Sequence, residues 1–552
     1  MCLQEVPFVG ATGSGTIGER VGSRSRGIRA SRPPMNGAPS KRMKRSPNSA
    51  STDYELGETA SLPTLRRNEM AAGRRRGIYA ISDRAAVATV FVIAMFMDIM
   101  DGTIVNTALP AIGQDFHHGS PTDLAWVVLG YLMSLAIWIP ASGWLGDKFG
   151  TKKVFLFALL MFTAASMLCG TAHSIDQLTA FRFLQGVGGG MMAPVGTAML
   201  YREYPPMERA KVGALLSIPT LLAPATGPVL GGYITDGLGW RWIFFINLPF
   251  GIVAFVIGVL RLKEYKNHTA GKFDPAGFFL SAISFGAILY GLNQVELEGW
   301  RSTRVLSSLA VGIALGAVLI FVERRIAEPI LALRLFKDRV FTMTNITSVF
   351  ATASFFGLVL IMPLMLQGVR GLSPSESGLT TFPQAIGVIL MSQVARKLYP
   401  IVGPRRLISL GLVVAGFVML LLMWTTPATN LWVYRAILFG RGLCWAFVFI
   451  PLQAAAFSQI QPLDTGRASA LFSTQRQVAS SLGIAVLISV LMAQLNKIPS
   501  HAHYLVNAYN AYKVPFMWTC IFAFLGALTA LFIDDEKVLS VFRKPSVPSS
   551  HS

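Results

Sequence analysis

Two carboxylates lie in the first long apolar stretch of the chain, within FMDIMDGTIVNTALP. Asp98 lies about 12 residues into the predicted helix, which is about 18 Å at 1.5 Å per residue. Asp101 follows at i+3, so both carboxylates lie on one helix face. Two close carboxylates in an apolar site favour a shared proton, so the pair could couple transport to protons or bind a cationic substrate. A structural role, with one of them bonded to Thr103, Asn106 or a neighbouring helix, is the alternative.

A single arginine lies inside the fourth apolar stretch, DQLTAFRFLQGVGGGMMAPVGTAML. Arg182 is about one and a half turns inside the predicted helix, where a guanidinium keeps its charge and needs a carboxylate, water or carbonyl partner. It could instead be an anchor that extends to the membrane interface. The glycines that follow it predict close helix packing: Gly186, Gly188, Gly189 and Gly190. No strand precedes GVGG, so a dinucleotide-binding loop is not predicted.

The turn after the second apolar stretch, GWLGDKFGTKKVF, combines glycines with charged residues. Gly143 and Gly150 permit close packing and a sharp turn. Asp147 can lie at the start of the next helix, where a carboxylate favours the positive end of the helix dipole. Lys152 and Lys153 are expected to face the cytoplasm. From the residues alone, an ordinary loop that sets the topology is the simpler interpretation.

Prolines and glycines alternate in the fifth apolar stretch, LLAPATGPVLGGYITD. Pro224 and Pro228, together with Gly227, Gly231 and Gly232, predict a kinked helix that packs closely on a neighbour. Neighbouring helices in a membrane can satisfy the backbone groups that a proline leaves free. Simple packing competes with a functional role as the reason for this pattern.

These residues need a scaffold of helices in lipid. Of the 552 residues, 53% are hydrophobic and 14% are charged, whereas soluble proteins carry about 25% charged residues. From residue 85 onward, apolar stretches recur at roughly the 20 residues that a helix needs to cross a bilayer. Backbone in lipid must satisfy its own hydrogen bonds, which favours helices. We predict fourteen spans, at about 86–111, 122–146, 152–172, 176–201, 209–235, 241–260, 275–293, 304–322, 340–366, 376–399, 405–424, 431–458, 468–494 and 514–533.

The charge pattern predicts the orientation. The chain has 48 Lys and Arg against 28 Asp and Glu, a formal net charge of +20. The basic residues lie mainly between apolar stretches, which indicates cytoplasmic loops rather than a nucleic-acid-binding surface. The loop GQDFHHGSPTD after the first span has no Lys or Arg, whereas predicted inner loops carry pairs such as Arg405 and Arg406. We therefore expect a multi-pass protein of the cytoplasmic (inner) membrane with both termini in the cytoplasm.

The chain divides into a tail and two related halves. Residues 1–83 are rich in Gly, Ser, Arg and Pro and are predicted to be a disordered basic cytoplasmic tail, with Met70 as an alternative start. GDKFGTKK after the second span and ARKLYPIVGPRR after the tenth are weakly alike, as in transporters built from repeats. We predict an N-terminal six-helix bundle at 84–262, two inserted helices at 263–325, a C-terminal six-helix bundle at 326–535 and a cytoplasmic tail at 536–552.

The residues do not predict catalysis. HExxH, GxSxG and GxxxxGK[ST] motifs do not occur in the sequence, so we expect neither an enzyme nor ATP as the energy source. The four cysteines are far apart and form no CxxC pair, which predicts no disulfide framework and no metal site. Those in or beside apolar stretches are expected to pack as small hydrophobic residues: Cys169, Cys444 and Cys520.

Several of these motifs occur in a fixed order along the chain. The order is Asp101-x-Thr-Ile-Val-Asn-x-Ala-Leu-Pro, GWLGDKFGTKK, RFLQGVGGG, ATGPVLGG and GWRWIFFINLPFG, followed by IPLQAAAF and RASALFSTQRQVASSLG. Together they resemble the signatures of the 14-helix drug:proton antiporter branch of the major facilitator superfamily, over about residues 85–535. The resemblance implies an all-α membrane protein with the major facilitator fold, two six-helix bundles plus two extra central helices (14 transmembrane helices).

The resemblance also implies roles for single residues. Asp101 matches the acidic position of helix 1, associated with proton and cation coupling, and Asp98 shares its face. Arg182 matches the helix-4 arginine tied to proton transfer. The loop that gates alternating access is matched by Gly143, Asp147, Gly150 and Lys152. The helix-5 motif typical of exporters is matched by Gly227, Pro228, Gly231 and Gly232.

The chain departs from the family pattern at several positions. Ala223 stands where a first glycine is usual, and Thr151 stands where a basic residue is usual. The second-half copy of the gating loop keeps Gly403, Arg405 and Arg406, but it has Pro400 where an acidic residue would fall. This change argues against a symmetrical charge lock in the second half, where two further arginines lie near apolar stretches: Arg435 and Arg476.

The expected function is a proton-coupled exporter of hydrophobic drugs or toxic small molecules, with cationic substrates as an option. The expected site for protons comprises Asp98, Asp101 and Arg182, and the two carboxylates are also candidates for substrate binding. Export of a native metabolite, lipid or siderophore is the alternative, and a membrane sensor without transport is a third. Expected partners are the substrate, protons and membrane lipid, plus a periplasmic adaptor and an outer-membrane channel if the host is Gram-negative. We expect no metal, no cofactor beyond the proton gradient and no nucleic acid.

Overall fold

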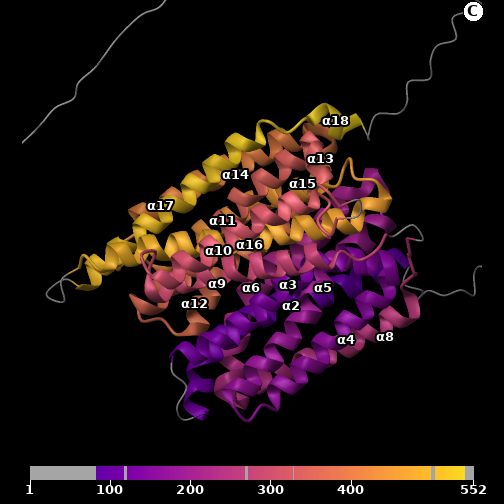
Figure 1. Cartoon of the computed structure of the whole chain (residues 1–552). Coiled ribbons are helices and arrows are strands. Elements are labelled where there is room, and N and C mark those ends of the chain that lie inside the picture. The colour runs from indigo at the N-terminus through magenta and orange to yellow at the C-terminus, as the bar shows by residue number, and fades with distance from the viewer. Residues whose placement is uncertain (1–82, 117–120, 268–270, 327–328, 499–503, 541–552) are drawn as a thin grey trace, which may run out of the picture. The chain divides into compact units, whose positions relative to one another are not determined.

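The computed structural model describes residues 83–116, 121–267, 271–326, 329–498 and 504–540. These residues belong to one compact unit, Tyr79–Ser552. Their regular structure is helical, without a strand in any of these ranges (Figure 1). The tail predicted at residues 1–83 lies outside the described residues except for Asp83, as does the alternative start at Met70. Of the tail predicted at 536–552, only the first residues are described.

The helices follow one another through short connections. The first group is α2 (Asp83–Asp115), α3 (Pro121–Phe149), α4 (Thr151–Gly170), α5 (Ile175–Glu203), η1 (Pro206–Glu208), α6 (Arg209–Leu238), α7 (Trp242–Phe245) and α8 (Asn247–Arg261). The next is α9 (Pro275–Glu298), α10 (Thr303–Glu323) and η2 (Leu333–Lys337). The last is α11 (Arg339–Gly368), α12 (Pro374–Thr381), α13 (Pro383–Val402), α14 (Pro404–Leu420), η3 (Leu421–Trp424), α15 (Leu431–Ala456), η4 (Pro462–Asp464), α16 (Thr465–Leu495), α17 (Tyr504–Ala530) and α18 (Asp535–Leu539).

Capping residues explain where several helices begin. The side chain of Ser174 accepts a hydrogen bond from the Gln177 amide at the start of α5. Asp274 does the same for Gly277 at the start of α9, where Pro275 occupies the first helical position. Such side chains satisfy amides that have no partner within the helix. Because these caps are local, the sequence predicts most helix starts to within a few residues.

Each of the fourteen predicted spans corresponds to helical structure, and three of them are divided between two elements. The span predicted at 241–260 is divided into α7 and α8, the one at 376–399 into α12 and α13, and the one at 405–424 into α14 and η3. The last predicted span, 514–533, begins ten residues late, because α17 starts at Tyr504. Its first turns carry polar residues, but Tyr509 and Tyr512 in them are buried, so packing extends this helix beyond the apolar stretch.

Twelve helices of the described residues are long and apolar enough to cross a membrane, and α6 makes thirteen if its two bent parts form one span. The remaining candidate is α5, whose 29 residues are rich in glycine and contain Arg182. Apolar length and composition therefore do not confirm fourteen spans exactly. They do establish the all-α membrane fold.

The kink predicted in the fifth span is present. The two parts of α6, Arg209–Pro224 and Thr226–Leu238, meet at an angle of 42°. Pro219, Pro224 and Pro228 all lie inside this helix, and an internal proline removes a backbone hydrogen bond and clashes with the preceding turn. The bend thus follows directly from the residue types.

Helices of the two predicted halves meet along one interface. On one side α3 and α5 pack against α16, and on the other α6 packs against α12, α13 and α15. The helices within each half pack on one another as well, for example α3 on α5 and α13 on α15. The boundaries predicted at 262 and 326 remain predictions, since Tyr79–Ser552 forms one compact unit.

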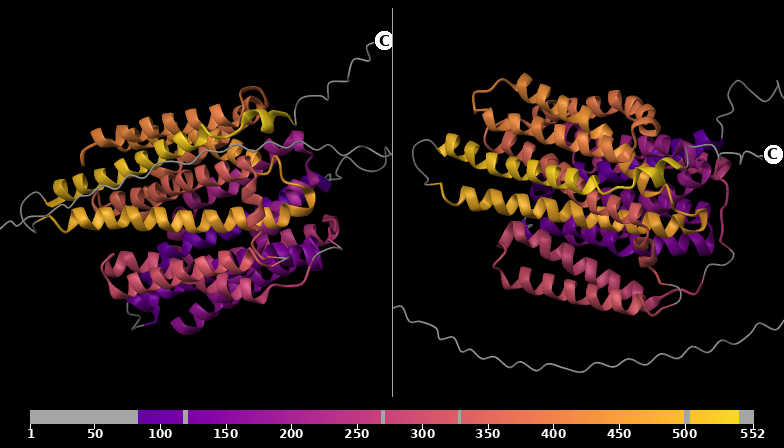
Figure 2. Two further views of the ribbon diagram at one scale, coloured as in Figure 1. Left: turned by 45° about the horizontal axis from the view of Figure 1, so that its top comes forward. Right: turned by 90° about the horizontal axis from the view of Figure 1, so that it is seen from above.

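The pair α9 and α10 lies at the margin of the helical unit (Figure 2). α9 packs against α3 and α16, whereas the main neighbour of α10 is α9. α10 consequently presents large apolar side chains outward, such as Ile313 at 64% exposure. An apolar surface of this kind suits contact with lipid tails.

Candidate transport site

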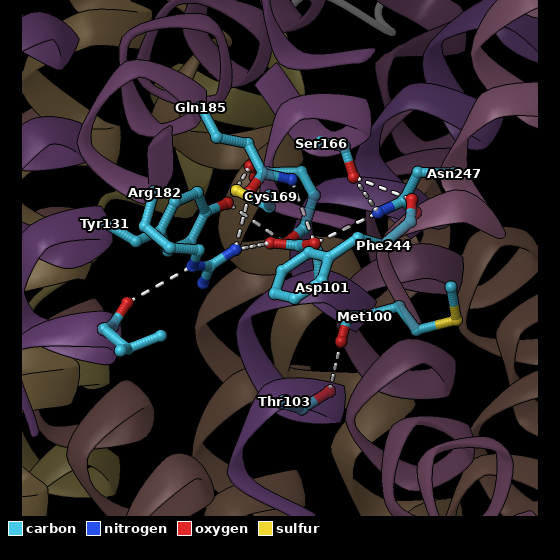
Figure 3. Close-up of polar contacts among 12 residues, drawn as sticks. Met100, Asp101, Thr103, Tyr131, Ser166, Cys169, Arg182, Gln185, Phe244 and Asn247 are labelled. Carbon is cyan, nitrogen blue, oxygen red and sulfur yellow. Dashed lines mark hydrogen bonds and ion pairs between the residues drawn. The ribbon is translucent and has the colours of Figure 1, made fainter. Parts of the chain in front are cut away.

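A buried ion pair lies inside the first group of helices. Nη1 of Arg182 in α5 donates a hydrogen bond to Oδ2 of Asp101 in α2, and both side chains are 0% exposed. Oδ1 of Asp101 accepts hydrogen bonds from Nε2 of Gln185 at 3.0 Å and from Nδ2 of Asn247 at 3.0 Å (Figure 3). Both carboxylate oxygens are therefore engaged by donors from α5 and α8.

The guanidinium of Arg182 has further partners that fix its position. Nη1 also donates to Oε1 of Gln185 at 2.7 Å, and Nε donates to the carbonyl of Val127 at 3.3 Å. The guanidinium carbon lies 4.2 Å from the centroid of the Tyr131 ring, a cation–π arrangement. The interpretation of Arg182 as an anchor at the membrane interface is thus wrong, because its charge is satisfied inside the bundle.

A second layer of hydrogen bonds holds Asn247 against the ion pair. Its Nδ2 also donates to Oγ of Ser166 at 3.0 Å, and Oγ of Ser166 donates to the carbonyl of Phe244 at 2.9 Å. Phe244 lies in α7 and Asn247 is the first residue of α8, so the break between these helices brings a carbonyl and an amide to one point (Figure 3). The network therefore links α2, α4, α5, α7 and α8.

Asp98 lies in a different environment from Asp101, although the two are three residues apart. Its Oδ1 accepts a 2.6 Å hydrogen bond from the hydroxyl of Tyr131, and the residue is 8% exposed. A Cβ atom on Gly189 would lie 2.4 Å from the same oxygen, so glycine at this position makes room for the carboxylate. Thr103 bonds the carbonyl of Met100 rather than either carboxylate. Asp98 is thus held by a neutral hydroxyl, whereas Asp101 is held by a charged group.

Arg476 of α16 brings a positive charge from the second half toward Asp98. The two charges interact electrostatically across the interface. Tyr131 thus contacts both charged groups of this region. Its hydroxyl donates a hydrogen bond to Asp98, and its ring packs against the guanidinium of Arg182. The sequence singled out Arg476 but gave no partner for it.

The predicted gating loop joins α3 to α4 and meets the second half. Asp147 is buried in the last turns of α3, and its Oδ1 accepts a 3.0 Å hydrogen bond from Nη2 of Arg202. A Cβ atom on Gly143 would lie 3.0 Å from the carbonyl of Gly466, so α3 and the start of α16 approach closely there. The expectation that Asp147 lies at the start of α4 is wrong, because it faces the start of α16, a helix of the other half.

Glu264 occupies the place at α4 that we expected for Asp147. Its carboxylate oxygens accept hydrogen bonds from the backbone amides of Lys152 at 3.0 Å and Lys153 at 3.3 Å. Gly150 precedes these amides with φ of +102°, a conformation that favours glycine. The side chain of Lys152 donates to the carbonyl of Val259 at 2.8 Å. A carboxylate at the start of a helix stabilises the free amides there.

The second half repeats this construction. Gly403 has φ of +87° before α14, and Oδ1 of Asp535 accepts a 2.8 Å hydrogen bond from the Arg405 amide. Burial raises the pKa of Asp535, and the Arg405 amide and nearby arginines oppose that change. The two capping carboxylates, Glu264 and Asp535, each follow the last long helix of their half, α8 and α17. The weak symmetry in the sequence therefore corresponds to a structural symmetry. The ion pair of Asp147 has no such counterpart at Pro400, as the sequence indicated.

We expect Asp147→Asn to slow transport about tenfold while the protein stays folded. The pair with Arg202 lies at a contact between the halves, and a loss of about 1.4 kcal/mol in one conformation changes a rate or population about tenfold. Initial transport rates in vesicles, normalised to protein amount, would measure the effect.

Asp115→Asn is the matched control, since it breaks an ion pair with Arg241 in which both partners are exposed. That variant should transport normally. Equal transport rates for Asp147→Asn and the wild-type protein would indicate that the segment between α3 and α4 is an ordinary loop without a gating role.

The glycines of α6 allow contact with α2, as predicted. A Cβ atom on Gly227 would lie 2.2 Å from Oγ1 of Thr103, and one on Gly231 would lie 2.2 Å from Oγ1 of Thr107. Gly232 is buried and Pro228 is half-buried. Any side chain at the first two positions would push α6 away from the helix that carries Asp98 and Asp101.

A small cavity lies between the two halves. Its volume is about 20 Å³ and its lining comes from α2, α5, α6, α15 and α16. That volume admits about one water molecule, whereas a drug-sized ligand needs about 300 Å³ or more. The halves therefore close around the cavity in this conformation.

Aromatic contacts close the cavity toward the end at which α2 begins. The Tyr201 ring stacks on Phe457 with centroids 4.2 Å apart, and the Tyr201 hydroxyl donates to the carbonyl of Gln453 at 3.0 Å. Nη1 of Arg209 also donates to the carbonyl of Phe457. These bonds join the first half to the second, on the side predicted to be cytoplasmic.

Sequence reasoning missed one buried charge in the second half. Arg441 in α15 is fully buried; its Nη1 donates to Gln384 and its Nη2 to the carbonyls of Ser354 and Phe355 at 3.3 Å. Carboxylates are absent from its partners among the described residues. The rule that pointed to Arg182, an ionisable residue within a span, would have found it.

Metal-ligating residues do not cluster in groups of three or more within the described ranges. The three described cysteines are free and buried. The Sγ atom of Cys169 lies 3.7 Å from Oε1 of Gln185, beside the ion pair. The site thus contains carboxylates, guanidinium groups and a cavity between the halves. Such groups can bind a small molecule and take up or release a proton.

A helical membrane unit of two halves, with buried charges beside an interface cavity, defines the class of secondary transporters. The family model described as the Major Facilitator Superfamily matches residues 91–484, and the chain belongs to this family of transporters, which are not enzymes. It is 34% identical to the "Multidrug resistance protein B homolog" of Mycobacterium tuberculosis over 437 residues, 77% of this chain and 80% of that protein.

Further relatives agree with this assignment. The chain is 34% identical to the "Multidrug transporter protein MdtP" of Bacillus subtilis, over 75% of this chain and 76% of that protein. It is 30% identical to the "Multidrug export protein EmrB" of Escherichia coli, over 71% and 77% of the two chains. The crystal structure of the human organic anion transporter MFSD10 shares the fold, with a TM-score of 0.57 at 14% identity, covering 81% of this chain and 99% of that one.

Proposed function

We propose that this protein is a proton-coupled exporter of hydrophobic drugs or toxic small molecules across the cytoplasmic membrane. The family assignment and the multidrug transporters among its relatives support export of such molecules. The observation that supports proton coupling is the pair of carboxylates in α2. Among the described residues, Asp101 is paired with Arg182, and Asp98 accepts its side-chain hydrogen bond from the neutral hydroxyl of Tyr131. An adaptor and an outer-membrane channel belong to the proposal only for a Gram-negative host.

The two carboxylates have different roles in this proposal. Asp101 and Arg182 form a framework that keeps five helices of the first half together, since each member neutralises the other away from water. Asp98 takes up and releases the transported proton, because its hydrogen bond comes from a neutral group and the interface is beside it. From the sequence, Asp101 was the first choice for the proton-coupling residue. Because both of its oxygens accept hydrogen bonds from Arg182, Gln185 and Asn247, we assign proton coupling to Asp98 instead.

Protonation at Asp98 changes the forces between the halves. An ionised Asp98 on α2 attracts Arg476 on α16, and a proton on Asp98 removes that attraction. A transporter of repeat type alternates by movement of one half against the other, so a charge that links the halves can bias the alternation. Each charge moved through 100 mV supplies about 2.3 kcal/mol.

The orientation in the proposal has both termini in the cytoplasm. The basic residues of the predicted inner loops motivate it. A reporter enzyme active only outside the cytoplasm should be active when fused after residue 118 and inactive when fused after residue 268. The opposite pattern would contradict the orientation and the cytoplasmic position of the gating loop.

Inside-out membrane vesicles test the proposed function. We expect an acid vesicle lumen to drive uptake of a hydrophobic dye, with ethidium as a cationic and 8-anilinonaphthalene-1-sulfonate as an anionic probe. Uptake of at least one dye should stop when a proton ionophore collapses the gradient. Vesicles that accumulate neither dye, or that accumulate dye without a gradient, would overturn proton-coupled export.

A further inference from the structure

Arg476 is the charged side chain that lines the interface cavity. The polar part of the lining comprises hydroxyl and amide groups from both halves, at Thr197, Thr220, Gln453 and Ser473. The apolar part includes the rings of Phe91, Phe457 and Phe472. Asp98 interacts with Arg476 from a distance but does not line the cavity. The cavity therefore presents one positive charge on an apolar and hydrogen-bonding surface.

The guanidinium of Arg476 is available to a ligand. Arg476 is half-buried and makes no hydrogen bond or ion pair with any other residue that the structure describes; it interacts electrostatically with Asp98. Two fully buried arginines differ in this respect, since Arg182 is bonded to Asp101 and Arg441 to Gln384 and backbone carbonyls. A guanidinium offers planar donors that match a carboxylate, sulfonate or phosphate group.

The buried charges around the interface favour an anion. Asp101 is neutralised by Arg182, and Asp98 interacts electrostatically with Arg476, whereas Arg441 has no carboxylate partner among the described residues. The charges of these five residues sum to one positive charge when both carboxylates are ionised. A proton on Asp98 makes this region more positive.

We propose that the substrate is an amphipathic organic anion whose acidic group binds Arg476 and whose aromatic or apolar body contacts Phe91, Phe457 and Phe472. This inference rests on the proposed export function and names the substrate class for it. The cavity is too small for such a ligand in the present conformation, and it is lined from both halves, so movement of the halves enlarges it. A proton on Asp98 strengthens anion binding within one conformation, and a bound anion likewise favours that proton. Exchange of a proton for the substrate is therefore set by which loaded forms allow the halves to move, and not by competition for one carboxylate.

Binding of two matched probes to the purified protein in lipid nanodiscs tests the proposal. Naphthalene-2-sulfonate and 2-naphthyltrimethylammonium share one aromatic body and carry permanent opposite charges. Titration calorimetry should show that wild-type protein binds the sulfonate at least about tenfold more tightly. Arg476→Gln should lose about 10- to 100-fold in affinity for the sulfonate, Arg476→Lys should lose less, and binding of the ammonium probe should not weaken in either.

Two further variants make the result specific. Arg435→Gln removes a guanidinium that lies on Trp432, with ring and charge 4.6 Å apart, outside the cavity lining, and should leave sulfonate binding unchanged. Asp98→Asn should tighten sulfonate binding, because it removes the negative charge that faces Arg476. A monodisperse elution profile for each variant separates lost binding from misfolding.

Several outcomes would overturn the inference. Tighter binding of the ammonium probe would indicate a cation at Asp98, and equal sulfonate affinity in wild-type protein and Arg476→Gln would place the anion elsewhere. Absence of sulfonate binding to a transport-active preparation would also overturn it. These results differ from failure of the proposed function, which would appear as vesicles without gradient-driven uptake of either dye.

Discussion

Asp98→Asn protein is expected to fold normally and to lose the proton exchange that substrate binding drives, with a reduction of at least about 100-fold. Asparagine preserves the shape of the side chain and can still accept the hydrogen bond from Tyr131, but it cannot take up a proton. Detergent-solubilised protein in weakly buffered solution, with a pH-sensitive dye, measures the protons exchanged on addition of substrate. An anion that binds more tightly beside a protonated Asp98 should make the wild-type protein take up protons.

Asp98→Glu is the matched variant, because it keeps the titratable group. The Asp98 carboxylate already lies against Gly189, so the longer side chain of glutamate must displace its neighbours. We expect partial substrate-driven proton exchange in this variant. Undiminished proton exchange in Asp98→Asn would place the coupling site elsewhere, with Asp101 as the next candidate.

Breaking the ion pair between Asp101 and Arg182 is expected to have the largest effect on stability. Removal of one partner of a buried pair costs about 3–5 kcal/mol, because the other charge stays in an apolar site. Asp101→Asn and Arg182→Gln should each lower the unfolding temperature in detergent strongly, and the double variant should recover most of the loss. Fluorescence-detected size-exclusion chromatography after heating measures all three.

The result of this double-mutant cycle decides between a framework and a dispensable contact. Coupling energies of about 0.5–3 kcal/mol are usual for residues in one network, and this pair also orders Gln185 and Asn247. Additive losses in the double variant would mean that the two residues stabilise the protein independently, which would contradict the framework role.

The sequence predicted the scaffold because its signals are local. Apolar length and prolines act within one helix, and they predicted the α6 bend and the start of α5 within one residue of Ile175. The same rule, that charge in lipid is costly, selected Asp98, Asp101 and Arg182. Glycine-rich stretches likewise indicated close contacts, which the structure shows at Gly189 and Gly227.

The partners of these residues could not be predicted, because they depend on how distant helices pack. Asn247 reaches Asp101 only through the break between α7 and α8, and a 20-residue apolar stretch gives no sign of that break. Asp147 was assigned to the nearest helix in sequence, whereas its neighbours are Arg202 and the start of α16. Gln185 could have been predicted as a partner of Arg182, since it lies at i+3 from Arg182 on the same helix.

Proteoliposomes that contain the purified protein and a luminal pH indicator test the central claim, exchange of substrate for protons, most directly. With an acid lumen, we predict that 8-anilinonaphthalene-1-sulfonate added outside accumulates inside while the lumen becomes more alkaline. Nigericin, which collapses the pH gradient, should abolish both signals, and Asp98→Asn should show neither. Dye accumulation without a change in luminal pH, or accumulation that persists in the presence of nigericin, would contradict proton-coupled export.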